Sequence, residues 1–315
     1  MTPVLAIVVP VYNEMNMIPV AIQKLLNVLK GMIGSEVVHQ DSYIIFVDDG
    51  SADDSWRLLS DAYKLNRQCR AIKLSRNFGH NIALLAGLTS IKDLCDVSIS
   101  IDCDLQQDPS AMHQFLDEFQ AGADIVFGIR NDRKTDGFFK KYTALAFYRA
   151  MQMMGVKLHT NHADYRLLSR RALNALASYH EPNIFLRAIC VDMGFHSASI
   201  YFDVVEREHG TSKYSISKML KFAVDGITSF SALPLRMISV LGIIVFGLSF
   251  LMSGYILIKT LFIGGTSPGW ASTVLPIYLL GGLQIFCLGV VGEYISQIYA
   301  AAKGRPRYII ESELL

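Results

Sequence analysis

The sequence predicts an α/β fold in which a doubly wound, mainly parallel sheet is followed by two membrane-spanning helices. Short apolar stretches alternate with helical patterns in the first half of the 315-residue chain, which is typical of a parallel sheet covered by helices on both faces. Two later apolar stretches each exceed the roughly 20 residues that cross a bilayer. The hydrophobic content of 51% and the mean hydropathy of +0.32 are above those of ordinary soluble domains.

The elements of the sheet domain follow from the periodicity of the apolar residues. We expect strands over Leu5–Val9, Tyr43–Val47, Ala71–Leu74, Val97–Ile101 and Asp124–Gly128. We expect helices between them, at about 15–30, 53–66, 80–91 and 109–121. Asp108 is expected to cap the last of these helices, with Pro109 in its first turn.

Polar side chains follow all five expected strands. They are Tyr12-Asn13-Glu14, Asp48-Asp49-Gly50-Ser51, Arg76-Asn77, Asp102 with Asp104, and Arg130-Asn131-Asp132-Arg133. Each group alone is compatible with ordinary turns and helix caps. Together they predict a binding site, because ligands of such sheets bind beyond the carboxyl ends of the strands. The chain has neither G-x-G-x-x-G after the first strand nor a P-loop, so phosphates would be held by a metal and by cationic side chains.

The pair Asp102 and Asp104 is the most informative of these groups. Residues two apart in an extended chain point to the same face, so the two carboxylates would lie side by side and repel each other. A hard cation such as Mg²⁺ or Mn²⁺ relieves that repulsion and takes carboxylates together with substrate phosphates as ligands. The pair therefore favours an enzyme that handles a nucleoside diphosphate through a metal, whereas a bare D-x-D can also be a pair of solvated loop acids.

The two predicted membrane helices cover about 237–262 and 274–299. Basic residues lie before the first span and after the second, at Lys218, Lys221 and Arg236 and at Lys303, Arg305 and Arg307. By the positive-inside rule, both flanks and hence both termini are cytoplasmic. The N-terminus does not resemble a signal peptide, so we expect a multi-pass protein of the inner (cytoplasmic) membrane with a cytosolic catalytic domain.

The predicted organisation therefore has four parts. Residues 1–213 form the cytosolic domain, 214–235 a juxtamembrane amphipathic helix, 236–300 the membrane hairpin and 301–315 a cytosolic tail. The helical spacing of apolar residues in the second part suits a helix lying in the membrane surface, although a helix packed on the core would show the same pattern.

Other classes of function are disfavoured by composition. The net charge of +1 gives no footprint for nucleic acid. The five cysteines are scattered without a C-x-x-C spacing, which argues against a disulfide framework or a zinc site. Glycines within the two spans would allow close helix packing, and we expect a homo-oligomer.

Several motifs together resemble those of a known enzyme family. They are Val8-Val9-Pro10-Val11-Tyr12-Asn13-Glu14, Val47-Asp48-Asp49-Gly50-Ser51, Asp102-x-Asp104-Leu105-Gln106, Asp164-Tyr165-Arg166-Leu167, Arg207 to Ser215, Pro234-Leu235-Arg236 and Gly292-Glu293-Tyr294-Ile295. The set resembles the inverting glycosyltransferase family 2, and within it the branch that uses polyprenyl phosphate acceptors. The resemblance covers essentially the whole chain and implies a GT-A fold for the cytosolic domain.

The resemblance also implies roles for individual residues. Residues expected to bind the nucleotide-sugar are Pro10, Tyr12, Glu14, Asp49, Arg76 and Asp102, with Tyr12 stacking on the base and Asp49 accepting the uracil N3–H. The expected catalytic residues are Asp104, Gln106, Arg130 and Asp164, and Asp102 and Asp104 would hold the metal. Arg133, Arg207 and Lys213 would bind the lipid phosphate. Asp164 is either a general base or a residue that positions the acceptor or Arg166.

The reaction implied is transfer of a sugar from a nucleotide-sugar to undecaprenyl or another polyprenyl phosphate. Glucose from UDP-glucose is the first choice, and 4-amino-arabinose derivatives, N-acetylglucosamine and mannose stay open. A membrane-anchored scaffold without activity is the alternative from another class. Retention of five residues together argues against that alternative: Asp49, Asp102, Asp104, Arg207 and Lys213.

Overall fold

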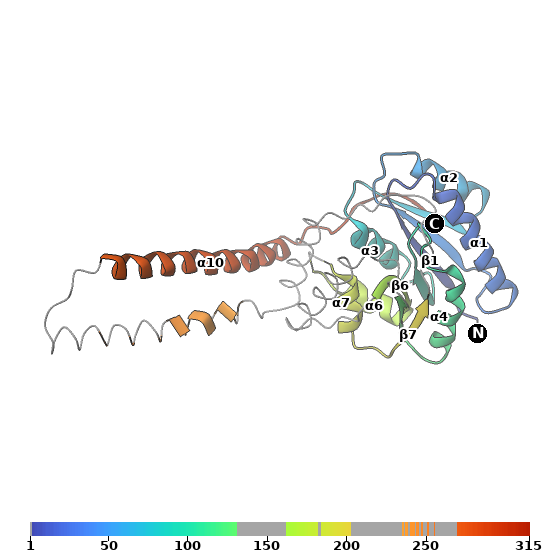
Figure 1. Cartoon of the computed structure of the whole chain (residues 1–315). Coiled ribbons are helices and arrows are strands. Elements are labelled where there is room, and N and C mark those ends of the chain that lie inside the picture. Colours follow the sequence, from blue (N-terminus) through green and yellow to red (C-terminus); the bar gives the residue numbers. More distant parts are fainter. Residues whose placement is uncertain are drawn as a thin grey trace.

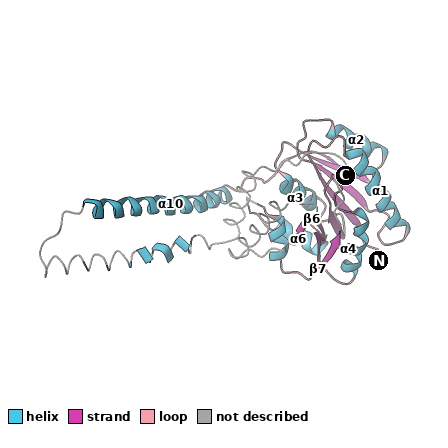
Figure 2. Ribbon diagram, viewed as in Figure 1, coloured by secondary structure: helices cyan, strands magenta, loops and turns pink. Residues whose placement is uncertain are grey.

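The computed structural model describes residues 2–130, 162–181, 184–202 and 270–315, together with some residues between 235 and 255. An eight-stranded sheet runs in the order β7-β5-β6-β4-β1-β2-β3-β8. Figure 2 shows strands in magenta with helices around them. Its strands are β1 Leu5–Val11, β2 Tyr43–Asp48, β3 Cys69–Leu74, β4 Val97–Ser100, β5 Ile125–Arg130, β6 His162–Ser169, β7 Ser197–Phe202 and β8 Ile310–Leu314. The helices described are α1 Ile18–Gly34, α2 Ser55–Leu65, α3 His80–Ser90, α4 Met112–Gln120, α6 Arg170–Ala177, α7 Leu186–Asp192 and α10 Trp270–Ala302.

The predicted α/β fold with a mainly parallel sheet is confirmed in the residues described. Strand β1 pairs in parallel with β2 and β4, β2 with β3, and β5 with β7. Three pairings are antiparallel: β6 lies between β4 and β5 and runs against both, and β8 runs against β3. The five predicted strands and the four helices between them are all present, with bounds shifted by a few residues.

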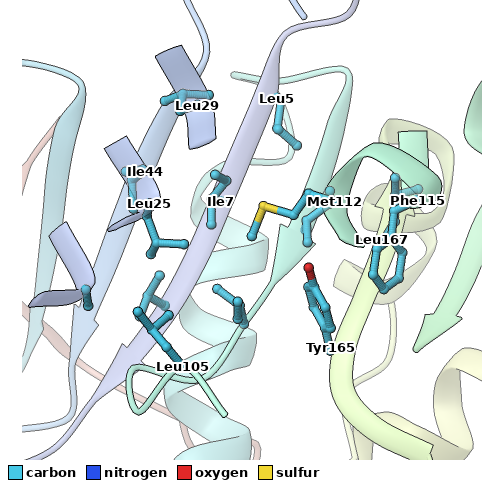
Figure 3. Packing of buried hydrophobic residues seen from close by; sticks show 14 of the residues in the cluster. Leu5, Ile7, Leu25, Leu29, Ile44, Leu105, Met112, Phe115, Tyr165 and Leu167 are labelled. Atoms are coloured by element: carbon cyan, nitrogen blue, oxygen red, sulfur yellow. The ribbon is translucent and has the colours of Figure 1, made fainter. Parts of the chain in front are cut away.

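Both faces of the sheet are buried, which explains why β1 is apolar at every position. Alternate residues of a strand point to opposite faces. Leu5 and Ile7 pack with residues of α1 and α4 in one apolar cluster, part of which Figure 3 shows. Ala6 and Val8 pack on the other face with residues of α3, α6 and α7. Figure 1 shows these two sets of helices on opposite sides of the strands.

Helix α3 lies so close to the sheet that only glycine fits at one point of contact. A Cβ at Gly87 would lie 2.6 Å from Val8 Cγ1 and 2.7 Å from Val47 Cγ2. This close packing holds α3, which begins at His80, against β1 and β2.

The expected cap before α4 is confirmed. Pro109–Ala111 forms a short 3₁₀ turn that continues into α4, and the Asp108 carboxylate accepts a hydrogen bond of 2.9 Å from the N–H of Ser110. Pro109 stands in the first turn, where its missing N–H costs nothing.

The region predicted to span the membrane is described in part. Helix α10 contains the second predicted span, and its stretch Leu283–Ala302 has a mean hydropathy of 1.4 with none of it buried. By length and composition this is the one helix long and apolar enough to cross a bilayer among the residues described. It extends away from the sheet in Figure 1. The first predicted span lies largely outside the described residues, although those given between 235 and 255 are helical.

Candidate active site

The loops that follow β1 and β2 are joined by hydrogen bonds. The N–H of Asn13 donates to Ser51 Oγ at 2.9 Å, and Asn13 Oδ1 accepts from the N–H of Ala52 at 2.8 Å. Asn13 has a left-handed backbone with φ of +52°, a conformation that asparagine tolerates better than most residues. The side chain of Asn13 therefore organises the edge of the sheet and is not simply a helix cap.

Pro10 is accommodated inside the central strand β1 because the pairing with the neighbouring strand β4 ends before Pro10. The pairing of β1 with β4 ends at Val8 and Ser100, and Val8 O accepts from Ile101 N–H. Alternate residues of a strand direct their N–H and C=O groups to opposite neighbours, so the nitrogen of Pro10 faces the side on which β4 has already ended. Its missing donor removes no bond from the sheet.

Asp49, the residue expected to read the base, holds the loop that follows β3. Its carboxylate accepts from the N–H groups of Phe78 at 2.7 Å and Gly79 at 2.9 Å. Burial raises the pKa of this carboxyl, and the two N–H donors oppose the rise. Each carboxylate oxygen has a second lone pair, so contact with a uracil imide stays a prediction.

The residue after Asp49 must be glycine for the end of β2 to approach the loop that follows β3. The backbone of Gly50 is left-handed, with φ of +66°, and a Cβ there would lie 2.4 Å from the carbonyl carbon of Arg76. Since the obstructing atom is backbone, no side-chain rotation relieves the contact. Gly50 thus lets the end of β2 approach the loop that carries Arg76, and Arg76 stacks its guanidinium 4.0 Å from the ring centroid of Phe78.

Asp102 is fixed by a glutamine that sequence analysis did not single out. Gln107 Nε2 donates to Asp102 Oδ2 at 2.6 Å, and Gln107 Oε1 accepts from the N–H of Asp102 at 2.9 Å. Gln107 is almost fully buried, so this reciprocal pair sets the direction of the Asp102 carboxylate. Asp104 Oδ1 accepts from the N–H of Gln106 at 3.2 Å, which ties the two predicted catalytic residues into one turn.

The Asp164 carboxylate on β6 is the centre of a charged cluster. Arg187 of α7 binds it in a bidentate manner, with Nη2 at 2.8 Å from Oδ2 and Nε at 3.1 Å from Oδ1. Arg166 Nη2 also donates to Oδ1. His80 Nε2 lies between two carboxylates, 3.5 Å from Asp164 Oδ2 and 3.6 Å from Asp102 Oδ1. The structure therefore brings Asp164 to the predicted metal-binding pair, through His80.

The charges in this cluster depend on one another. Burial alone would lower the pKa of His80, but the hydrogen bond with Asp164 and the charge of Asp102 raise it to about 9. Burial would raise the pKa of Asp164, but the positive charge of Arg187 and the hydrogen bond with His80 hold it well below its usual range. These interactions favour the carboxylate form of Asp164 and the imidazolium form of His80.

The comparison with known proteins identifies the family. Residues 6–177, which contain all of the site residues described so far except Arg187, match the model of the family described as Glycosyl transferase family 2. The chain belongs to glycosyltransferase family 2.

Relatives of this glycosyltransferase match it from end to end. A Bacillus subtilis protein named uncharacterized glycosyltransferase YkoT is 45% identical over 99% of this chain and 92% of its own. The bactoprenol glucosyl transferase of Shigella phage SfV is 35% identical over 98% of both chains. An uncharacterized glycosyltransferase of Synechocystis is 37% identical over 98% of this chain and 95% of its own.

The other predicted site residues are placed as follows. Tyr12 is exposed at the end of β1, and Glu14 follows it. Arg130 is half-buried at the carboxyl end of β5. Arg133, Arg207 and Lys213 lie outside the described residues.

The carboxylates of the glycosyltransferase site suit a hard divalent cation. Burial raises the pKa of Asp102, and the neighbouring carboxylates of Asp164 and Asp104 raise it further, while His80 opposes them. A cation between Asp102 and Asp104 would relieve this repulsion, and Mg²⁺ needs only one or two protein carboxylates when substrate phosphates supply other ligands. Among the described residues no group of three or more His, Cys, Asp and Glu side chains is arranged to hold a metal alone.

Three residues of the cluster were missed by sequence analysis. His80 follows the end of β3 closely, so the rule that polar residues gather at strand ends could have included it. Gln107 lies one residue beyond the motif that was recognised. Arg187 carries no local signal, because it meets Asp164 only through the packing of α7 on β6.

Proposed function

We propose that this glycosyltransferase transfers glucose from UDP-glucose to a polyprenyl phosphate, with inversion at the anomeric carbon. The observation that carries the proposal is the similarity to a bactoprenol glucosyl transferase over 98% of both chains. The match is not confined to the sheet domain but includes the C-terminal apolar region. A polyprenyl acceptor resides in a bilayer, so an apolar helix attached to the catalytic domain suits it.

The same proposal includes a two-helix hairpin in the inner membrane, with the catalytic domain and both termini in the cytoplasm. The apolar, unburied helix α10 supports the second span. Support for the first span comes from the described residues Met237, Val240, Ile244, Leu251 and Tyr255, which are helical and exposed. A cysteine placed at Ser267 should react with an impermeant thiol reagent from outside, and one at Ser312 should not; the opposite pattern would reverse the orientation.

The chemistry requires positioning more than proton removal. An acceptor phosphate oxygen attacks the anomeric carbon, and the bond from that carbon to UDP breaks with its electrons on the UDP oxygen. A phosphate monoester has a second pKa of about 6, so the attacking oxygen already carries charge at neutral pH. Catalysis then depends on orientation and on control of repulsion between the two phosphate groups.

Asp164 acts in this scheme as a positioning residue. Its two oxygens accept hydrogen bonds from Arg166 and Arg187. Those cations stabilise the carboxylate and oppose its protonation, which makes Asp164 a weak base. Its contribution is to orient the arginines and, through His80, the Asp102 carboxylate.

The remaining roles concern the donor. Asp102 and Asp104 would hold Mg²⁺ or Mn²⁺, which supplies positive charge against the diphosphate that leaves. Tyr12 and Asp49 lie at adjoining strand ends, where a base can stack on the ring of Tyr12 and donate a hydrogen bond to the Asp49 carboxylate. Arg76 lies on the loop that Asp49 holds. These positions support a donor site at the ends of β1, β2 and β3.

The decisive experiment measures transfer directly. Membranes containing the protein are incubated with undecaprenyl phosphate and labelled UDP-glucose, UDP-N-acetylglucosamine, UDP-4-amino-arabinose derivatives or GDP-mannose, and the lipid extract is analysed by mass spectrometry. We expect a glucosyl lipid from wild type and none from Asp104→Asn. A preference for GDP-mannose would show that the donor is GDP-mannose and not UDP-glucose. Absence of every product would favour the inactive scaffold.

A further inference from the structure

The Asp102 residue is held by both polar atoms of a single side chain, the amide of Gln107. Gln107 Nε2 donates to Asp102 Oδ2 at 2.6 Å, and Gln107 Oε1 accepts from the N–H of Asp102 at 2.9 Å. Gln107 is 1% exposed, whereas the side chain of Asp102 is 29% exposed. The amide therefore contacts the carboxylate from the interior and leaves its accessible side to a ligand.

The second oxygen of this carboxylate is not committed to a hydrogen bond. Among the described residues, the contact recorded for Asp102 Oδ1 is His80 Nε2 at 3.6 Å, which is beyond the range of a hydrogen bond. Gln107 thus fixes the direction of the Asp102 carboxylate through Oδ2, and Oδ1 keeps its capacity to bind a cation.

The turn that brings Gln107 back to Asp102 is strained and is held by its surroundings. Leu105 has φ of +48°, in a region that bulky residues rarely adopt and that persists only where packing imposes it. Its side chain is buried in the apolar cluster beneath α1 and α4 (Figure 3), and its N–H donates to Asp102 O at 3.1 Å. After Gln107, the carbonyl oxygen of Asp108 accepts from the buried Tyr165 hydroxyl at 3.0 Å. The reach of Gln107 to Asp102 is therefore part of the fold.

An amide is the group that suits this position chemically. A lysine or arginine could also donate to Asp102, but its charge would oppose a cation that arrives between Asp102 and Asp104. A glutamate would place an acceptor against an acceptor. The amide supplies a donor and leaves the negative charge of the acidic pair intact. Carboxylates that bind metals are themselves held by such hydrogen bonds, and loss of the holding group costs about 10–100-fold in metal affinity or activity.

We infer that Gln107 is a positioning residue that orients Asp102 in advance for a divalent cation, and thereby sets the affinity of the site for the metal. The inference rests on the proposed function and deepens its metal site at Asp102 and Asp104. A glutamine with a purely structural role would instead only close the turn that precedes Asp108.

The test compares Gln107→Met with Gln68→Met in the full-length protein in detergent. Methionine has nearly the length of glutamine but removes both hydrogen bonds without adding charge. Gln68 is a matched control, because its Nε2 also donates to an oxygen, that of Ser42 at 3.4 Å, and because it lies directly before β3, at the opposite ends of the strands. Electron paramagnetic resonance of free Mn²⁺ measures metal binding in the presence of UDP, and denaturant unfolding measures the folded fraction.

We expect Gln107→Met to raise the dissociation constant for Mn²⁺ about tenfold or more, while Gln68→Met stays within about twofold of wild type. The Mn²⁺ concentration that gives half of the maximal transfer rate should rise by a similar factor. Saturating Mn²⁺ should restore most of that rate, because the bound metal then holds the carboxylate itself. An affinity equal to that of Gln68→Met, or a rate reduced alike at every Mn²⁺ concentration, would overturn the inference.

A second variant keeps the test decisive if Gln107→Met does not fold. Gln107→Asn retains the amide on a side chain one methylene shorter, so its affinity for Mn²⁺ should lie between those of wild type and Gln107→Met. An affinity of Gln107→Asn equal to that of the control would overturn the inference. Because binding is measured without turnover, wild type that binds Mn²⁺ with UDP but transfers no glucose would refute the proposed function alone, and wild type that binds no Mn²⁺ would overturn this inference.

Discussion

The contacts of Asp164 with Arg166 and Arg187 lead to a prediction about Asp164→Asn. The substitution keeps the size of the side chain but removes the charge that neutralises Arg166. That guanidinium is almost fully buried, and its Nε is buried without a hydrogen-bond partner among the described residues. Removing one partner of a buried pair costs about 3–5 kcal/mol. We expect a loss of this size in the free energy of unfolding.

The exposed pair of Asp61 and Lys64 provides the control. Their side chains are 54% and 72% exposed, and such surface pairs contribute about 0–1 kcal/mol. Asp61→Asn should therefore leave stability almost unchanged. Denaturant unfolding of the three proteins in the same detergent gives the comparison, and glucose transfer is measured in parallel.

A second substitution tests whether the unpaired charge of Arg166 causes the loss of stability. Adding Arg166→Met to Asp164→Asn removes the unpaired buried charge, so it should restore most of the lost stability. If Asp164→Asn were as stable as wild type, or if the double variant were no more stable than Asp164→Asn, our reasoning from the buried pair would be refuted.

Three further predictions test other parts of the site. Gly50→Ala should be about 1–3 kcal/mol less stable than Gly122→Ala. The backbone angle φ is positive at both residues (+66° and +102°), but only at Gly50 would the new Cβ meet backbone atoms, those of Arg76. Equal midpoints of unfolding for the two variants would contradict this prediction. Asp104→Asn, or a chelator added to wild type, should abolish transfer without unfolding the protein, and persistent transfer in both would remove the metal from the mechanism. Deletion of residues 309–315 should lower stability, since it uncovers the edge of β3; an unchanged midpoint of unfolding would show that β8 contributes nothing.

The parts of the fold that could be predicted are those whose signal is local. Strands β1 to β5 are short apolar stretches bounded by turn residues, and the helices between them have apolar residues at helical spacing. Strand β6 was not predicted, because it contains two charged residues, Asp164 and Arg166, that are buried as an ion pair. A buried charge looks like a surface residue until its partner is known, and here the partners come together only in the folded sheet.

The residues of the candidate site likewise divide into those with a local sequence signal and those brought together only by folding. The acids after β2 and β4 were found because parallel strands bring their carboxyl ends to one edge. The contact of His80 with both Asp102 and Asp164 could not be predicted. It depends on the position of α3 and on the insertion of β6 beside β4. Neither is encoded by the spacing of residues along the chain.

The C-terminal segment connects the apolar helix α10 to the loop that follows β3. After α10 the chain returns to the sheet domain, where β8 pairs with β3 and Lys73 Nζ lies 3.0 Å from Glu311 Oε1. The N–H of Ser75 donates to Ile309 O at 2.9 Å, directly before the loop that carries Arg76. Asp49 holds the far end of this loop. The loop expected at the donor is therefore fixed on one side by Asp49, at the end of β2, and on the other by Ile309, directly before β8.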